Sequence, residues 1–452
     1  MNDGKTTTIV LVGGGASGVL LAARLLRAPD PALRVVVVEK TGSFGRGLAY
    51  ATPLEVHLLN VGAHGMSAFA DQPDHFRDWL AARGVALARD ALWFAPRRLY
   101  GDYLGDIAAT LAGREPERLR LVHGEVVSVS PHRGGATLGL DGGTTLEADI
   151  VVLAAGHDPQ PAGPVAAAIR PGAAQDTPLD PLAAVLILGT GLSMVDAWQA
   201  LKAAGHRGAV VAVSRRGLAP RPHLPELPAP LALDDVPLGA SPARLMQWLR
   251  RRVRDAQAAG GRWQNVVDGL RPFNQRIWQA WSVDDRRRFL RHAKAWWDVH
   301  RHRAAPQVHA ELAQAIAAGQ LKILAGRVEG VVREQQGFAV AVRPRGNAEP
   351  ETLAATRIYD CTGVVRDVAA GSLAAVRSLT DRGLARPDPL GLGLDVSGEC
   401  AVIDAAGAAS ARIFAIGPLT RGALFEIEAV PDIRVQAERL ASHLAAHLAR
   451  GL

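Results

Sequence analysis

The chain has 452 residues, of which 48% are hydrophobic and 21% charged, so it is long enough to form two compact domains. Its formal net charge is +7, but no zinc-finger spacing or aromatic RNA-binding stripe accompanies the arginines, which argues against nucleic acid as a partner. No apolar run approaches a membrane span, and Cys361 and Cys400 are not spaced as a redox or metal-binding pair. We therefore expect a cytoplasmic globular protein with reduced thiols, no bound metal and no membrane partner.

The first informative pattern is a strand, a glycine-rich turn and a helix. A β-branched run at 7–12 leads into the turn at 13–18, and apolar residues at helical spacing follow it. In a dinucleotide-binding fold, Gly13 forms the tight turn, Gly15 admits a pyrophosphate to the backbone, and Gly18 lets the helix approach the strand. The pyrophosphate then lies at the start of the helix, where unpaired N–H groups favour an anion.

The next predicted strand, 35–38, ends in Glu39, which is followed by Lys40. A carboxylate at this point accepts hydrogen bonds from an unphosphorylated ribose and repels a ribose 2′-phosphate. The first site is therefore predicted to bind FAD or NAD rather than NADP. The alternative is a structural glycine turn with a glutamate on the surface.

The same pattern recurs in the second half of the chain. A buried strand at 185–188 precedes a second glycine turn, in which Met194 replaces the third glycine. This turn and the start of its helix comprise Gly189, Thr190, Gly191, Leu192, Ser193 and Met194. The following strand, 210–213, ends in Ser214, Arg215 and Arg216, and Arg215 stands at the same distance from Gly189 as Glu39 does from Gly13. Two guanidinium groups and a hydroxyl suit a 2′-phosphate, so the second site is predicted to prefer NADPH, with a solvated loop as the alternative.

Each glycine turn is followed by a β-rich stretch that ends in a small residue and a glycine. The first stretch runs from 124 to 156 and the second from 326 to 363. This duplication predicts an α/β fold with two Rossmann-like dinucleotide-binding domains, the second inserted in the first. The expected boundaries are 1–170 and 355–452 for the FAD domain and 180–350 for the NADPH domain. A helical insertion is expected at about 240–305, where most of its six tryptophans should be core.

With these motifs in place, the chain resembles the bacterial FAD/NAD(P)-binding flavoproteins that include FAD-dependent urate hydroxylase and aspartate N-hydroxylase. The motifs that carry the resemblance are GRGLAY at 45–50, HLLNV at 57–61, PRRLYG at 96–101, GTGLS at 189–193, WDVHRHR at 297–303 and DCTG at 360–363. The chain departs from the flavoprotein pattern in having Gly417-Pro418 in place of Gly-Asp, so one expected FAD contact is missing. Gly62 also stands where a proline is common in the group.

The resemblance implies an FAD-dependent, NADPH-using monooxygenase acting with molecular oxygen on a small polar nitrogenous substrate, either a urate-like heterocycle or an amino acid. A reductase or diaphorase that passes electrons to a protein or quinone acceptor needs the same cofactor sites and remains an alternative. A flavin-binding regulatory protein without turnover is a third reading, against which the NADPH-selective site argues.

Cofactor contacts are expected at both glycine turns and at the segments that close on them. Those for FAD are Gly13, Gly15, Ala16, Ser17, Gly18, Glu39, Lys40, Arg46, Val126, Ala155, Gly156 and Gly417. Those for NADPH are Gly189, Gly191, Leu192, Ser193, Ser214, Arg215 and Arg216. The final helix, opened by Pro431, either points its positive end at the flavin or is an ordinary helix start.

The candidates for contact with substrate or nicotinamide are Asn60, His57, Arg97, His300 and Arg301, and for each the alternative is a structural role. Tyr100, in the same motif as Arg97, either binds substrate or packs the start of a helix. His300 and His302 are two residues apart, so on a helix they point to different faces, which argues against a shared metal. The sequence predicts no oligomeric state.

Overall fold

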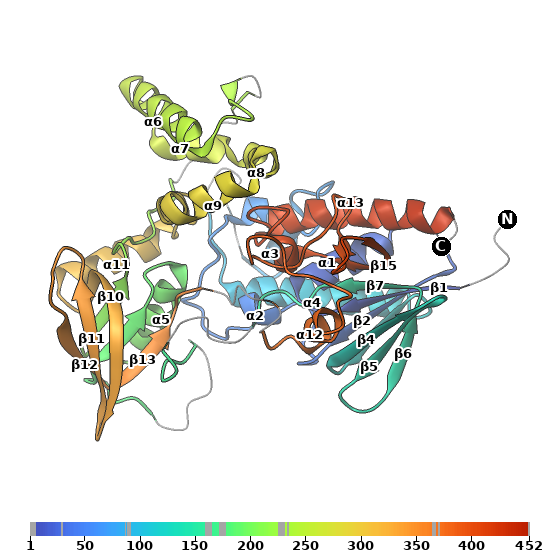
Figure 1. The fold of residues 1–452 in the computed structure, drawn as a ribbon, viewed down its shortest axis with the longest axis horizontal. Coiled ribbons are helices and arrows are strands. Elements are labelled where there is room, and N and C mark those ends of the chain that lie inside the picture. Colours follow the sequence, from blue (N-terminus) through green and yellow to red (C-terminus); the bar gives the residue numbers. More distant parts are fainter. Residues whose placement is uncertain are drawn as a thin grey trace. The chain divides into compact units, whose positions relative to one another are not determined.

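A computed structural model describes residues 6–28, 30–85, 87, 92–158, 165–170, 178–224, 231–232, 235–363, 368 and 371–450. The chain divides into two compact units (Figure 1). Unit 1 contains Met1–Pro53, Val61–Pro159 and Val365–Leu452, and unit 2 contains Leu54–Asn60 and Gln160–Val364. Unit 2 is therefore inserted in the sequence of unit 1.

Unit 1 is built on a six-stranded sheet in the order β14-β15-β7-β1-β2-β3. Its strands are β1 (Thr7–Val12), β2 (Leu33–Glu39), β3 (Leu119–His123), β7 (Ile150–Leu153), β14 (Ala401–Ile403) and β15 (Ala409–Ala415). All neighbours pair in parallel except β14 and β15, which are antiparallel. The valine-rich strands β1 and β2 are buried almost throughout, as expected for a sheet covered on both faces.

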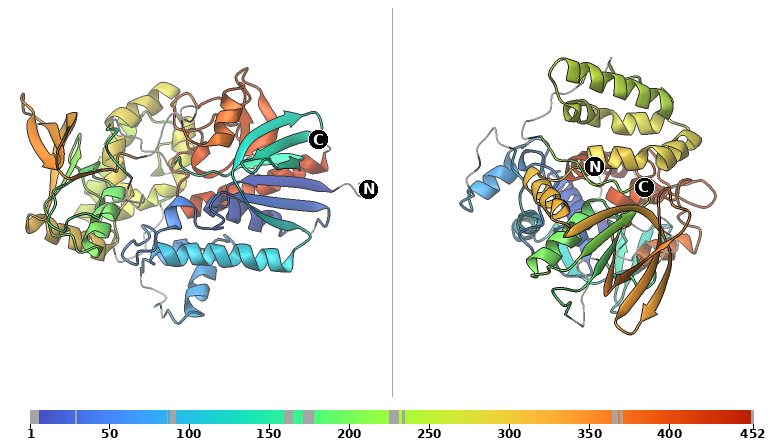
Figure 2. Two further views of the ribbon diagram at one scale, coloured as in Figure 1. Left: turned by 90° about the horizontal axis from the view of Figure 1, so that it is seen from below. Right: turned by 90° about the vertical axis from the view of Figure 1, so that its left-hand side faces the viewer.

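Helices and a second sheet cover the two faces of this sheet. On one side α1 (Ala16–Leu25) packs against α4 (Arg97–Arg114) and α13 (Val430–Ala449). On the other lie α12 (Ala374–Thr380) and the antiparallel strands β4 (Val126–His132), β5 (Gly135–Leu140) and β6 (Thr145–Ala148), which share a core with β1 and β7. Figure 2 shows this three-stranded sheet and α4 on opposite sides of β1 and β2. Three short helices, α2 (Gly47–Tyr50), η1 (Ala63–Gly65) and α3 (His75–Ala81), lie in the segment between β2 and α4.

Unit 2 repeats this plan with a six-stranded sheet in the order β12-β11-β10-β9-β8-β13. Its strands are β8 (Val185–Leu188), β9 (Val210–Ser214), β10 (Leu321–Glu334), β11 (Gly337–Pro344), β12 (Glu351–Ala355) and β13 (Arg357–Asp360). The strand β8 leads into α5 (Leu192–Ala203), as β1 leads into α1. The strand β10 is parallel to β9 over its first residues and antiparallel to β11 afterwards, so one long strand takes the place of β3 and β4.

A group of helices lies between β9 and β10 in the sequence, and Figure 1 labels most of them. It comprises α6 (Pro242–Ala258), α7 (Trp263–Gly269), η3 (Arg271–Phe273), α8 (Asn274–Ala280), α9 (Val283–His292), α10 (Lys294–Arg301) and α11 (Pro306–Ala317). The predicted fold, two Rossmann-like units with one inserted in the other and a helical insertion, is therefore confirmed.

The tryptophans of this insertion only partly form its core. Trp278, Trp281 and Trp297 are buried, whereas Trp296 is 43% exposed, because its helix turns that face to solvent. Both cysteines are unpaired and buried. In the part of the chain that the structure describes, no helix is long and apolar enough to span a membrane.

Candidate cofactor-binding sites

The first glycine turn connects β1 to α1 and holds the chain where a side chain would not fit. Gly13 has a φ of 112°, and a Cβ on it would lie 2.5 Å from the carbonyl oxygen of Ala154. Its N–H donates to the carbonyl of Val38 at 2.9 Å, which ties the turn to β2. Gly15 caps α1, and the nearest atom to a Cβ there would be the Cα of Gly47, 3.4 Å away. The space before the helix is thus bounded by glycines, which fits the approach of a pyrophosphate.

Ala16 and Ser17 form the first turn of α1, and Gly18 packs so closely that a Cβ would lie 2.0 Å from the carbonyl oxygen of Gly13. On the return side of the sheet, Ala155 and Gly156 follow β7, and Val126 begins β4. Lys40, after β2, forms an exposed ion pair with Glu125 at 3.7 Å.

Glu39 lies at the end of β2 and points back at the turn. Its Oε2 accepts a hydrogen bond from the N–H of Gly14 at 2.9 Å. Its Oε1 accepts from the N–H and the hydroxyl of Thr41, at 3.0 and 2.9 Å. The side chain is therefore buried and held in one orientation, and a carboxylate retains further lone pairs for the hydroxyls of a ribose.

The Gly417 turn is completed by a residue that sequence reasoning missed. The N–H of Gly417 donates to Oε1 of Gln436 in α13 at 2.8 Å, and Nε2 of Gln436 donates to Thr420 Oγ1 at 2.9 Å and to Cys400 Sγ at 3.3 Å. Gln436 thus fixes the backbone of Gly417, which lies beside Ser17. Gly417 stands at the position where the Gly-Asp of other flavoproteins is expected. No sequence signal identified it, because a glutamine in an amphipathic helix has no distinctive spacing.

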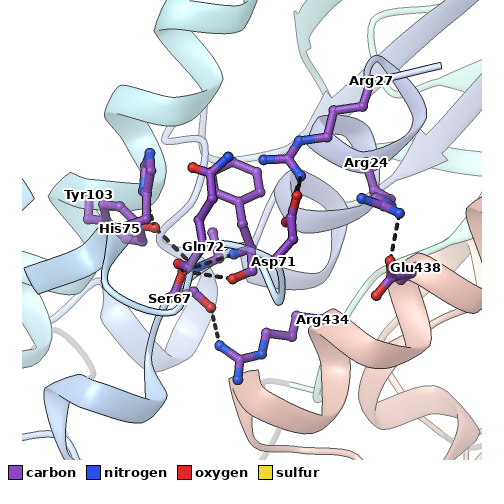
Figure 3. Close-up of polar contacts among 11 residues, drawn as sticks. Arg24, Arg27, Ser67, Asp71, Gln72, His75, Tyr103, Arg434 and Glu438 are labelled. Carbon is purple, nitrogen blue, oxygen red and sulfur yellow. Dashed lines mark hydrogen bonds and ion pairs between the residues drawn. The ribbon is translucent and has the colours of Figure 1, made fainter. Parts of the chain in front are cut away.

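A polar network fixes the segment that precedes α3 (Figure 3). Arg434 of α13 donates to the carbonyl of Ser67 at 2.8 Å, and the Ser67 hydroxyl donates to the carbonyl of Gln72 at 2.6 Å. The hydroxyl of Tyr103 in α4 accepts from the N–H of Ala68 at 3.1 Å. The segment is therefore held against α4 and the first turns of α13.

Two arginines at the end of α1 and just after it complete this network. Arg27 binds both carboxylate oxygens of Asp71 at 2.7 and 2.8 Å, and Arg24 pairs with Glu438 of α13 at 2.6 Å. A Cβ on Gly65 would lie 3.9 Å from Pro431, so η1 reaches the first turn of α13. The start of α13, for which the sequence predicts either a place at the flavin or an ordinary helix start, is held from two sides.

The second glycine turn repeats the geometry of the first. The N–H of Gly189 donates to the carbonyl of Val213 at 2.7 Å, and a Cβ on Gly189 would lie 2.2 Å from the carbonyl oxygen of Cys361. Gly191 caps α5, with no described atom within 4 Å of where its Cβ would be. Leu192 and Ser193 form the first turn of α5. An anion can reach these N–H groups as it can in unit 1.

The three residues after β9 differ in how far they are already engaged. The Thr190 hydroxyl donates its one proton to the carbonyl of Leu218 at 2.5 Å. The Ser214 hydroxyl, 2.8 Å from Thr190 Oγ1, therefore donates its own proton to Thr190 Oγ1. Arg216 donates to the carbonyl of His292 at 3.0 Å. Arg215 is exposed and makes no hydrogen bond or ion pair with any residue that the structure describes. Arg215 is therefore the least engaged of the three side chains.

The candidates for contact with flavin, substrate or nicotinamide are divided between the two units. Arg46 and Arg97 belong to unit 1, where Arg46 pairs with Asp102 of α4. His57 and Asn60 belong to unit 2, where His57 Nε2 donates to the carbonyl of Asp196 at 2.9 Å. Their predicted roles stay predictions.

The surroundings of Tyr100 are those of a residue that packs a helix. It is fully buried in α4, with its ring 4.8 Å from that of Tyr50, 5.1 Å from that of Phe76 and 5.5 Å from that of Tyr103. Burial raises the pKa of Tyr103 to about 12, so its hydroxyl keeps its proton at physiological pH.

A buried arginine that sequence reasoning did not single out follows the end of α10. His300 donates from Nδ1 to the carbonyl of Trp296 at 2.7 Å and packs edge-on against Trp263, and Arg301 is buried. Arg303, two residues further on, is 1% exposed and pairs with Asp268 of α7. Within the described ranges no three metal-binding side chains come together.

Comparisons with known proteins agree with this architecture. The family model described as FAD-NAD(P)-binding matches residues 10–158. The ornithine N-hydroxylase of Kutzneria sp. 744, solved with reduced FAD, NADP+ and L-ornithine, is 16% identical with a TM-score of 0.63 over 98% of this chain and 99% of that one. L-lysine 6-monooxygenase from Pseudomonas syringae is also 16% identical, with a TM-score of 0.61 over 98% and 100%.

A protein of another activity has the same fold. The bacillithiol disulfide reductase of Staphylococcus aureus is 12% identical with a TM-score of 0.55 over 99% of both chains. No curated protein matches the sequence. The comparisons thus show that residues 10–158, in unit 1, match an FAD-NAD(P)-binding model and that the chain shares the fold of these two-dinucleotide-domain flavoproteins.

Proposed function

We propose that the protein is an FAD-dependent, NADPH-using monooxygenase that hydroxylates a small nitrogen-bearing molecule, with an amino acid as the favoured substrate. The observation that carries this proposal is the difference between two equivalent positions. Glu39 lies beside the first glycine turn, and Arg215 stands at the corresponding position after the second. The first site thus suits an unphosphorylated adenosine and the second a 2′-phosphate.

In this proposal unit 1 is the FAD domain and unit 2 the NADPH domain. The start of α1 would bind the pyrophosphate of FAD and Glu39 its ribose, and the positive start of α13 would stabilise negative charge on the reduced ring. The start of α5 and Arg215 bind NADPH. When bound, FAD would take electrons from NADPH and use molecular oxygen to hydroxylate the substrate.

The two thiols support a monooxygenase over a disulfide reductase, although both activities occur on this fold. Burial raises the pKa of both Cys361 and Cys400, which disfavours the thiolate needed for disulfide exchange. The thiols also belong to different units, and Cys400 accepts a hydrogen bond from Gln436. The amino-acid substrate is favoured over urate because the named activities of the similar N-hydroxylases concern ornithine and lysine.

Stopped-flow reduction followed by product analysis tests the proposal. The purified protein, loaded with FAD, is reduced without oxygen by NADPH or NADH, and then mixed with oxygen and L-ornithine, L-lysine, L-aspartate or urate. We expect faster reduction by NADPH and, with one amino acid, a product heavier by one oxygen atom. Reduction that yields only hydrogen peroxide with every candidate would favour the reductase that passes electrons to a protein or quinone. Failure to retain FAD would contradict the cofactor assignment itself.

A further inference from the structure

The strongest unexplained feature is the buried guanidinium of Arg303, just after α10. Its Nη2 binds the Asp268 carboxylate, with Oδ2 at 2.5 Å, and the guanidinium lies 5.8 Å from the ring centre of Trp263. Its Nε and Nη1 are buried and have no hydrogen-bond partner among the described residues. A buried N–H without an acceptor destabilises the folded protein, and more so on a charged group, so this arrangement is unfavourable unless something supplies the missing acceptors.

A second unpaired polar atom lies on the same side of α7. Gln264 is 7% exposed, and its Oε1 is buried without a partner in the part of the chain that the structure describes. Gln264 and Asp268 are one helical turn apart, so they share the helix face that meets Arg303. The cluster thus offers both unpaired donors and an unpaired acceptor.

His223 is held beside Arg303 by backbone pairing but supplies no negative charge. The backbone N–H of His223 donates to the carbonyl of Ala304, the residue after Arg303, at 3.0 Å. Its Nε2 donates to the carbonyl of Asn60 at 3.0 Å. Burial, followed by the charge of Arg303, lowers the pKa of His223 to about 4, so the ring is neutral at physiological pH. Among the described residues, Asp268 therefore remains the carboxylate that binds Arg303.

We propose that Arg303 binds the carboxylate of the substrate amino acid, and that Gln264 accepts a hydrogen bond from an N–H of the same molecule. The inference rests on the proposed function, which makes the ligand a substrate. A carboxylate suits this place better than a phosphate, because Asp268 would repel a dianion more strongly than a monoanion. An amino acid satisfies the donors and the acceptor together, whereas the corresponding diamine leaves the arginine unpaired.

Calorimetric titration of the FAD-loaded protein tests this site without requiring turnover. The probes are L-ornithine and L-lysine, each compared with putrescine and cadaverine, which lack the carboxylate, together with L-aspartate. We expect at least one amino acid to bind the wild type, and any decarboxylated counterpart to bind far more weakly. Arg303→Gln should lower the affinity for the amino acid about 10- to 100-fold, because the charge-assisted hydrogen bonds are lost. Arg303→Lys keeps the positive charge but not the planar set of N–H donors, so it should bind the amino acid with intermediate affinity.

Two further variants separate a binding role from a structural one. Arg286→Gln is the matched control, because Arg286 lies in the same helical insertion and its Nε donates to the carbonyl of Trp278 at 2.8 Å. It should reduce stability and leave amino-acid affinity unchanged. Gln264→Leu removes an unpaired buried acceptor, so it should raise the melting temperature of the ligand-free protein. It should also lower the affinity for the amino acid. This comparison keeps the proposal testable if Arg303→Gln does not fold.

Two results with the wild type would overturn the proposal: no amino acid binds, or the diamine and the amino acid bind equally well. Unchanged affinity for the amino acid in Arg303→Gln would also overturn it. That result would mean that ordered water accepts the hydrogen bonds of Nε and Nη1. Failure of the proposed function looks different. If NADPH does not reduce the flavin but binding of the amino acid still depends on Arg303, the function is wrong and the site stands.

Discussion

Arg216 donates a hydrogen bond from Nη1 to the carbonyl oxygen of His292, 3.0 Å away at the C-terminal end of α9. Its Nη2 approaches the carbonyl of Arg291 at 3.4 Å, and its guanidinium lies 6.0 Å from the ring centre of Trp296. A cation at the end of a helix is favoured by the unpaired carbonyls there. Arg216 therefore links the segment after β9 to the helical insertion, whereas its neighbour Arg215 remains exposed.

This difference predicts that Arg215 alone carries most of the preference for NADPH. Arg215→Glu should raise the KM for NADPH about 10- to 100-fold and leave that for NADH unchanged or lower, because a carboxylate repels the 2′-phosphate. Steady-state flavin reduction with both nucleotides measures this. Arg216→Ala is the matched variant, expected to lower the melting temperature with a smaller change in nucleotide preference. Loss of preference in Arg216→Ala but not in Arg215→Glu would reverse the assignment.

The two tyrosines of α4 differ in what their hydroxyls do. The Tyr103 hydroxyl accepts from the N–H of Ala68 and lies 2.7 Å from Nδ1 of His75. The Tyr100 hydroxyl is buried without a partner among the described residues. Tyr103→Phe should therefore cost about 1–3 kcal/mol of unfolding free energy, while Tyr100→Phe should be neutral or slightly stabilising.

Urea denaturation of the two phenylalanine variants measures both effects on one helix. The same pair decides between the two readings of Tyr100. If Tyr100 only packs the helix, Tyr100→Phe keeps wild-type kcat and KM. A raised KM for the amino acid in Tyr100→Phe would instead assign its hydroxyl to substrate binding.

Gln436 is predicted to control the FAD site through the backbone of Gly417. Gln436→Leu leaves the Gly417 N–H and the Thr420 hydroxyl without this partner in a buried place, which should cost about 1–3 kcal/mol. FAD should then bind more weakly, because the turn beside Ser17 is no longer held. Fluorescence titration of the stripped protein with FAD measures the affinity.

The control for this variant is Val435→Ala. Val435 precedes Gln436 on α13 but its side chain is exposed, so shortening it removes no contact with the Gly417 turn. This variant should bind FAD with wild-type affinity. If Gln436→Leu binds FAD as tightly as Val435→Ala does, the turn does not depend on the glutamine.

The fold was predictable because its signals are periodic and repeated. The two glycine turns, the strands before them and the residues after the second strands recur at equal spacing, and local backbone geometry requires glycine at Gly13 and Gly189. The helical insertion was predicted at about 240–305, in the segment that holds six tryptophans. What the sequence could not show is that β10 runs straight through Gly326 and joins its hairpin to the main sheet, whereas Gly124 separates β3 from β4. The strand pairing of each unit decides this, and no local pattern records it.

The candidate sites were predictable only where the residue acts near its own motif. Glu39 reaches Gly14 across one strand, so its spacing from the turn is informative. Gln436 reaches Gly417 from a helix, and Arg303 reaches Asp268 on another helix, so tertiary packing alone brings each pair together. For the same reason the motif at 57–61 was not expected to pack with His223, whose partner is the carbonyl of Asn60.

His223 predicts a loss of stability in mild acid. Its pKa in the folded protein is about 4, below the ordinary value of 6.5, because burial and then Arg303 disfavour the charged ring. The unfolded chain therefore binds the proton more readily between about pH 6.5 and pH 4. The contribution of the neutral ring is fully present above pH 6.5 and is lost as the pH falls towards 4, by at most about 3 kcal/mol.

Urea denaturation at pH 7 and pH 5 measures this contribution. His223→Gln keeps a donor for the Asn60 carbonyl but cannot titrate, so its loss of stability between the two pH values should be smaller than that of the wild type. His132→Gln removes a histidine that is about half exposed and should follow the wild type. Equal losses in His223→Gln and the wild type would mean that His223 accepts a proton in the folded protein, and that the positive charge around Arg303 is already balanced there.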